Sequence, residues 1–178
     1  MKKLLLIIAI FIISLSSYGQ SAKETHESNS DKFALKTGVL LQKNISEIGK
    51  FKSISFDLIE IINLTDKSKV KSIRLKLPAA GDYTIDYVGT IDNDEVDGLI
   101  KSLELIKSNA ITIAPPVYTE VSYKCRSGFQ SGAYYDDKEK AWVYYLQMEY
   151  SKKSSKFFAA TELDELLTLL NSAKSKLL

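Results

Sequence analysis

The chain has 178 residues, with 24 basic and 22 acidic side chains, one histidine and one cysteine. This length is enough to bury a substantial core without disulfides, and a lone cysteine excludes an internal disulfide framework. The near-neutral charge provides no strongly basic surface of the kind that nucleic-acid binding requires, so no nucleic-acid partner is expected.

The first residues have the pattern of a secretory signal peptide. A basic start is followed by an apolar run too short to span a bilayer comfortably, and Ser17 and Gly19 supply the small side chains of a cleavage site before Gln20. The junction resembles export signals common in Bacteroidota, which implies a periplasmic or secreted bacterial protein. Residues 1–19 are therefore predicted to be removed, and no membrane span is expected in the mature chain.

The leader takes two basic residues with it and no acidic one, which leaves 22 of each. Residues 20–32 are polar and lack apolar periodicity, so they are predicted to be a disordered lead-in that contains His26. Alternating apolar residues predict a first strand over 33–41, followed by a turn over 44–50.

Three more strands are predicted over 53–62, around 73–77, and over 83–91. The strand over 53–62 changes parity near Leu58 and Ile59. Either a β-bulge at that point or burial of both faces would explain the change.

Residues 94–103 and 161–170 have closely similar sequences that align without a gap. Apolar residues three and four positions apart give each segment one apolar helical face. These residues are Val96, Leu99, Ile100 and Leu103 in the first segment, and Leu163, Leu166, Leu167 and Leu170 in the second. The first helix is expected to begin at Asp94 or Asp92 and to end near Ser108, and the second to begin at Thr161.

Between the two helices, four strands are predicted over 117–125, 129–135, 141–150 and 156–159. The chain is therefore predicted to be an α+β protein with a tandem β4-α repeat. Its expected architecture is a meandering antiparallel sheet of about eight strands with two helices packed on one face. Residues 33–178 would form a single domain made of two repeats, 33–110 and 117–178.

No catalytic residue, cofactor site or metal site is predicted. Cys125 shares a strand face with apolar residues and has no histidine partner, which favours a core position. Acidic residues cluster in two places, where helix capping and a solvated turn explain them: Asp92, Asp94, Glu95 and Asp97, and Asp136, Asp137 and Glu139. A hydrolase that acts on polysaccharide or peptidoglycan through paired carboxylates remains an alternative.

Aromatic residues are concentrated between positions 118 and 150. Most are expected to be core, but some of those on the sheet face opposite the helices are predicted to form a contact surface, with Tyr118, Tyr134, Trp142 and Tyr144 as its candidates. The leading hypothesis is an exported, non-enzymatic binding protein for an unknown protein, peptide or glycan. A homodimer through the sheet face and a carrier of small apolar ligands are further alternatives.

Overall fold

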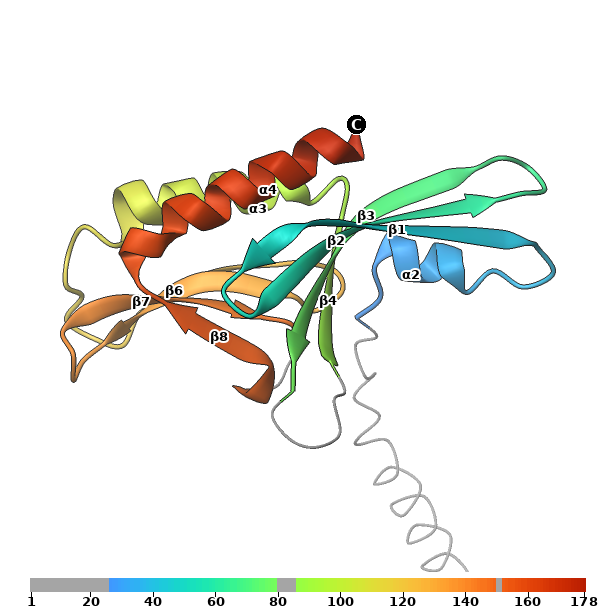
Figure 1. The fold of residues 1–178 in the computed structure, drawn as a ribbon. Helices are drawn as coiled ribbons and strands as arrows, with labels where there is room; N and C mark the ends of the chain where they lie inside the picture. The colour runs from blue at the N-terminus through green and yellow to red at the C-terminus, as the bar shows by residue number, and fades with distance from the viewer. Residues whose placement is uncertain (1–25, 80–85, 150–151) are drawn as a thin grey trace, which may run out of the picture.

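The computed structural model describes residues 26–79, 86–149 and 152–178. Over these ranges the chain is an α+β fold with two antiparallel four-stranded sheets (Figure 1). The first sheet has the order β1 (Leu41–Phe51), β2 (Ile54–Asn63), β3 (Lys69–Pro78) and β4 (Asp86–Asp92). The second has the order β5 (Glu120–Lys124), β6 (Gln130–Asp136), β7 (Ala141–Gln147) and β8 (Ser155–Phe158). The helices are α2 (Asn29–Ala34), α3 (Val96–Leu105) with a π-helical continuation (Ile106–Ala110), and α4 (Leu163–Leu177).

The sequence predicts one sheet of about eight strands, whereas the structure divides these strands into two sheets of four. The division falls where β4 meets the second sheet through side chains. A Cβ atom on Gly89 of β4 would lie 3.0 Å from the ring of Phe129, and the Ser127 hydroxyl donates a hydrogen bond to the Thr90 carbonyl. These contacts join β4 to the segment between β5 and β6 without a backbone ladder.

Each long helix follows four strands in the chain but packs mainly on the other sheet. α3 lies on β5 and β6, and α4 lies on β1, β2 and β3. Gly98 of α3 makes room for the Tyr123 hydroxyl on β5, since a Cβ there would come within 2.7 Å of that oxygen. Gly49 of β1 makes room in the same way for Leu169 of α4. Each sheet is therefore covered mainly by the helix from the other half of the chain.

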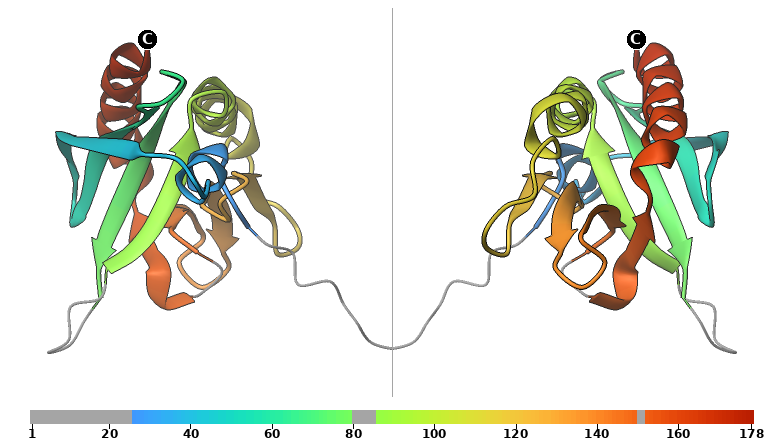
Figure 2. Two further views of the ribbon diagram at one scale, coloured as in Figure 1. Left: turned by 90° about the vertical axis from the view of Figure 1, so that its right-hand side faces the viewer. Right: turned by 90° about the vertical axis from the view of Figure 1, so that its left-hand side faces the viewer.

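α3 and α4 lie side by side on the same side of the two sheets (Figure 2). Ion pairs join them, from Lys107 to Asp164 at 2.5 Å and from Lys174 to Asp97 at 2.6 Å. These charges are largely exposed, so each pair contributes at most about 1 kcal/mol. Apolar burial must therefore supply most of the helix packing energy.

One hydrophobic core lies between these helices and the inner faces of both sheets. The apolar helix faces predicted from the sequence are confirmed, with Leu167 only partly buried and the others buried: Val96, Leu99, Ile100, Leu103, Leu163, Leu166 and Leu170. Burying one such side chain stabilises the fold by about 1.5–3 kcal/mol. The core thus lies against one face of each sheet, and the opposite face of each sheet points away from it.

The segment before β1 differs most from the prediction. The disordered lead-in predicted over 20–32 is wrong for its described part, because Asn29–Ala34 form α2. The Ser28 hydroxyl accepts a hydrogen bond from the Asp31 N–H at 2.9 Å, and the Asp31 carboxylate accepts one from the Ser28 N–H at 3.3 Å. This reciprocal capping box satisfies backbone donors at the start of a helix. Residues 20–25, like the predicted signal peptide over 1–19, lie outside the described residues.

The strand predicted over 33–41 is also wrong. α2 occupies its beginning, and β1 starts at Leu41 and runs through the turn predicted over 44–50. Residues 42–47 are exposed, so β1 lacks the buried alternation that would identify it in the sequence.

The parity change in β2 comes from burial on both faces. Ile54 and Phe56 belong to the main core, whereas Ile59 and Ile61 face α2, which covers the opposite side of the first sheet. The register between β2 and β3 is continuous. The bulge lies in β1, at Ile48, and not in β2.

The cap predicted for α4 is wrong by a few residues. Thr161 lies inside a 3-10 turn (Ala160–Glu162) that precedes the helix, and α4 itself begins at Leu163. The Glu162 carboxylate accepts a hydrogen bond from the Ala159 N–H at 2.9 Å. The Glu162 side chain, on the last residue of the turn, therefore caps the start of the turn and not the start of α4.

Candidate functional site

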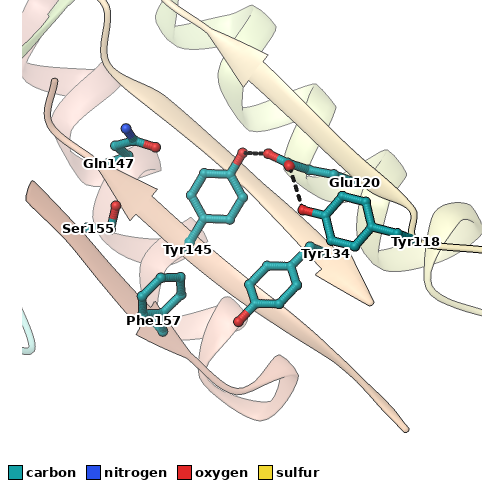
Figure 3. A pocket seen from close by; sticks show the side chains of 7 residues that line it. All are labelled: Tyr118, Glu120, Tyr134, Tyr145, Gln147, Ser155 and Phe157. Atoms are coloured by element: carbon teal, nitrogen blue, oxygen red, sulfur yellow. Dashed lines mark hydrogen bonds between the residues drawn. The ribbon is translucent and has the colours of Figure 1, made fainter. Parts of the chain in front are cut away.

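The outer face of the second sheet carries an open groove of about 410 Å³ (Figure 3). The strand register brings its side chains together, with Glu120 of β5 across from Tyr134 of β6 and Tyr145 of β7 across from Phe157 of β8. We call this surface the outer groove; it is lined by Tyr118, Glu120, Tyr134, Tyr145, Gln147, Ser155 and Phe157. Because the inner face of the same sheet packs on the core, the outer groove faces solvent.

Glu120 is the charged residue of the outer groove. One carboxylate oxygen accepts a hydrogen bond from the Tyr118 hydroxyl at 2.9 Å, and the other accepts one from the Tyr145 hydroxyl at 2.5 Å. The hydrogen bond to Glu120 raises the pKa of Tyr118; burial raises the pKa of Tyr145, and its bond to Glu120 raises it further. Both phenols therefore remain protonated donors at neutral pH and hold the carboxylate in one orientation.

Aromatic rings form most of the remaining surface. Tyr145 is only 5% exposed and lies at the bottom of the groove, while Tyr118 is 64% exposed and Phe157 is 52% exposed. The Tyr134 and Phe157 rings meet edge to face with centroids 6.1 Å apart. Gln147 lies on the far side of Tyr145 from Glu120 (Figure 3). The site thus combines one anchored negative charge with four aromatic rings.

The predicted contact residues fall on two different faces. Tyr118 and Tyr134 line the outer groove. Tyr144 is completely buried in the core, so its assignment to a contact surface is wrong. Trp142 lies on the same inner face of β7, where it packs edge to face on Tyr135 and donates a hydrogen bond to the Ile113 carbonyl at 3.3 Å.

Alternation along β7 explains the error. Trp142 and Tyr144 share one face of the strand, and Tyr145 points to the other. Both faces carry aromatic rings, so composition does not reveal which one meets the helices. The sequence interpretation missed the other five groove residues, which are Glu120, Tyr145, Gln147, Ser155 and Phe157. The residues that alternate with Trp142 and Tyr144 along β7, which include Tyr145 and Gln147, were the sequence signal for the other face of this strand.

A second, partly buried polar cluster lies around Arg126. Its guanidinium bonds the Asp92 carboxylate at 3.0 and 3.2 Å, forms a further pair with Asp94, and approaches Glu95 at 3.7 Å. Asp92 and Glu95 are buried, whereas Asp94 is exposed. The expected capping of α3 by Asp92 or Asp94 is not observed, because the N-cap position is Glu95, whose side chain makes no capping hydrogen bond to the helix.

Asp92 instead binds the start of α2. Its carboxylate accepts hydrogen bonds from the backbone N–H groups of Asn29 at 2.6 Å and Ser30 at 3.1 Å. Glu95 in turn accepts bonds from the backbone N–H groups of Arg126 at 2.8 Å and Asp92 at 3.2 Å. This cluster joins α2, the start of α3 and the β5–β6 connection, so its role is structural. Within the described ranges, no group of three or more His, Cys, Asp or Glu side chains is suited to a metal ion.

The core position predicted for Cys125 is confirmed. Its side chain is 2% exposed, and burial, with Glu95 and Asp92 nearby, raises the pKa of the thiol well above its ordinary value. A buried neutral thiol is a poor nucleophile. His26 is the first residue that the structure describes, and its side chain lies against Gly128.

No protein-family model matches the chain, and a search among curated proteins also gives no match. In the described ranges, every helix is too short or too polar to cross a bilayer. The functional interpretation therefore depends on the site itself.

Proposed function

We propose that this chain is an exported, non-enzymatic binding protein whose contact surface is the outer groove, and that the groove receives a basic side chain of a polypeptide partner. The observation that carries the proposal is the Glu120 carboxylate, held between two tyrosine hydroxyls in a groove with aromatic walls. Export is supported by the leader pattern of residues 1–19.

The chemistry of the outer groove favours a cation over a neutral ligand. Its seven lining residues include one carboxylate and no basic side chain. Aromatic faces attract ammonium and guanidinium groups through their quadrupoles, by about 0.5–1 kcal/mol at exposed sites and more where water is excluded. The aliphatic stems of lysine and arginine can also cover exposed rings such as Phe157.

A neutral glycan would stack on the same rings but would gain nothing from the charge of Glu120. Hydrolysis by paired carboxylates needs a second acidic group in the same cleft, and the groove lining supplies only Glu120. A carrier of small apolar ligands would need a cavity between sheet and helices, whereas the outer groove lies on the opposite face. The basic-peptide proposal is thus the one that uses both the charge of Glu120 and the aromatic walls of the groove.

NMR titration of the ¹⁵N-labelled mature chain tests this proposal. The probes are an acetylated pentapeptide with one lysine among glycines, the same peptide with norleucine instead of lysine, and a trimer of N-acetylglucosamine. The lysine peptide should shift amide signals on β5, β7 and β8, and should bind on the order of tenfold more tightly than the norleucine peptide.

Glu120→Gln should remove the preference for lysine over norleucine, and Phe157→Ala should weaken binding of both peptides. Glu104→Gln is the matched control, because it removes the same charge from an exposed position on α3. Groove signals that respond to the sugar trimer and not to the lysine peptide would assign the site to glycans. Equal binding of lysine and norleucine would refute the role given to Glu120.

A further inference from the structure

β1 is an edge strand whose outer side has no neighbouring strand in the described sheets. It is 11 residues long, and residues 42–47 are all exposed. A long edge of this kind presents unpaired backbone donors and acceptors that another strand can use. Its location, on the first sheet, is separate from the outer groove on the second.

The direction of the free backbone groups follows from the register. The Leu64 N–H donates to the Leu40 carbonyl at 2.9 Å, so the groups of Leu40 point toward β2. In an antiparallel pair the direction alternates with each residue. The backbone groups of Leu41, Lys43, Ile45 and Glu47 therefore point outward, away from β2.

These outward residues are self-complementary about Ile45. If a second copy pairs antiparallel with its Ile45 opposite the first, Lys43 of each copy lies opposite Glu47 of the other. Shifting the register by four residues in either direction places Lys43 opposite Lys43, or Glu47 opposite Glu47, which is unfavourable. Ile45 is 51% exposed in the single chain and would be covered by its own counterpart.

The strand pairing between two copies would be short. The bulge at Ile48 interrupts the regular pattern after Glu47, so in a pair centred on Ile45 the regular pairing would extend from Lys43 to Glu47 of each copy. A lysine at a sheet edge normally discourages association, but here a glutamate stands at the position that neutralises it in a two-fold pair. The paired segment would form about six backbone hydrogen bonds, a small interface that implies a concentration-dependent equilibrium.

We infer that a second copy of this chain docks on β1 through antiparallel strand pairing centred on Ile45, which joins two four-stranded sheets into one of eight strands. The partner is the chain itself because the charge pattern of the edge matches its own reverse. This dimer leaves the outer groove of each copy open and does not depend on what the groove binds.

Sedimentation equilibrium over about 5 µM to 1 mM tests the pairing, a range that suits a small interface. The wild-type chain should show a monomer–dimer equilibrium. Lys43→Glu and Glu47→Lys should each weaken dimerisation by about tenfold, since each places two pairs of like charges opposite each other. The double variant should restore the wild-type dissociation constant. A wild-type chain that stays monomeric, or a double variant no better than the single ones, overturns the inference.

Disulfide trapping supplies an independent readout. Ile45→Cys should give a cross-linked dimer under mild oxidation, because residues directly opposite in a hydrogen-bonded pair have Cα atoms about 5.5 Å apart. Gln42→Cys is the control, since two copies of residue 42 would lie far apart in this register. Cys125 is buried and does not compete. A dimer that forms through a sheet face would fail to cross-link at residue 45 and would refute pairing through β1.

Discussion

Arg126 connects parts of the chain that are far apart in sequence, and its removal should destabilise the fold strongly. The side chain is 37% exposed, whereas the side chain of its partner Asp92 is only 2% exposed. Replacing Arg126 with methionine would leave this buried carboxylate without its counter-charge. Breaking a fully buried ion pair by removing one partner costs about 3–5 kcal/mol.

The stability lost in Arg126→Met should be somewhat smaller than for a fully buried ion pair. Asp92 would keep the two hydrogen bonds from Asn29 and Ser30, and Glu95 would keep the backbone bond from position 126. The exposed contact with Asp94 adds less than about 1 kcal/mol. We therefore expect Arg126→Met to lower the free energy of unfolding by about 2–4 kcal/mol.

Urea denaturation followed by circular dichroism measures this loss. Asp94→Asn is the control, with an expected cost below about 1 kcal/mol, because Asp94 is exposed. In a double-mutant cycle, Asp92→Asn should cost much less in the Arg126→Met background than in the wild type, since no unpaired charge then remains. If Arg126→Met changes stability by less than about 0.5 kcal/mol, or if the two substitutions are additive, the cluster does not stabilise the fold in this way.

Three further predictions concern stability. Leu166→Asp should leave little soluble folded protein, because Leu166 is completely buried in α4; the soluble yield and thermal unfolding of the exposed-site control Thr168→Asp should stay near wild type. Burial raises the pKa of Asp57, but hydrogen bonds and charges from Arg74 and Lys76 outweigh burial and keep this pKa below its usual value. Urea titrations should therefore show the free energy of unfolding falling below about pH 4, and falling less steeply in Asp57→Asn. Gly132→Ala should lower the melting temperature strongly, because a Cβ would lie 2.2 Å from the Val121 carbonyl oxygen on the neighbouring strand.

The helices α3 and α4 could be predicted because their apolar residues recur at helical spacing and all meet the same core. Leu99 and Leu166, for example, are buried as the periodicity indicates. The inner strands were located within a few residues for the same reason. A buried face imposes a pattern on the sequence, and this pattern can be recognised without the structure.

β1 and α2 could not be predicted in this way because burial does not determine their sequences. β1 is held by hydrogen bonds to β2, and its side chains over 42–47 are exposed. α2 has only six residues and is fixed by its capping box and by the carboxylate of Asp92, which is 63 positions from Asn29 and 62 from Ser30. Ser28 and Asp31 carried the local signal of a capping box, but the contact with Asp92 is visible only in the fold.

The outer groove shows a different limit of prediction from the sequence. Tyr144 and Tyr145 are adjacent in the sequence and chemically identical, yet one lies in the core and the other at the bottom of the groove. Their environments differ because Tyr144 faces the shared core, where it stacks on Phe158, and Phe158 in turn packs on Phe51 from the first half of the chain. The face that carries the proposed contact surface is thus determined by packing against the first half of the chain, which includes α3 on β5 and β6. Substitutions that loosen α3 should therefore disturb the groove, although no groove residue lies on that helix.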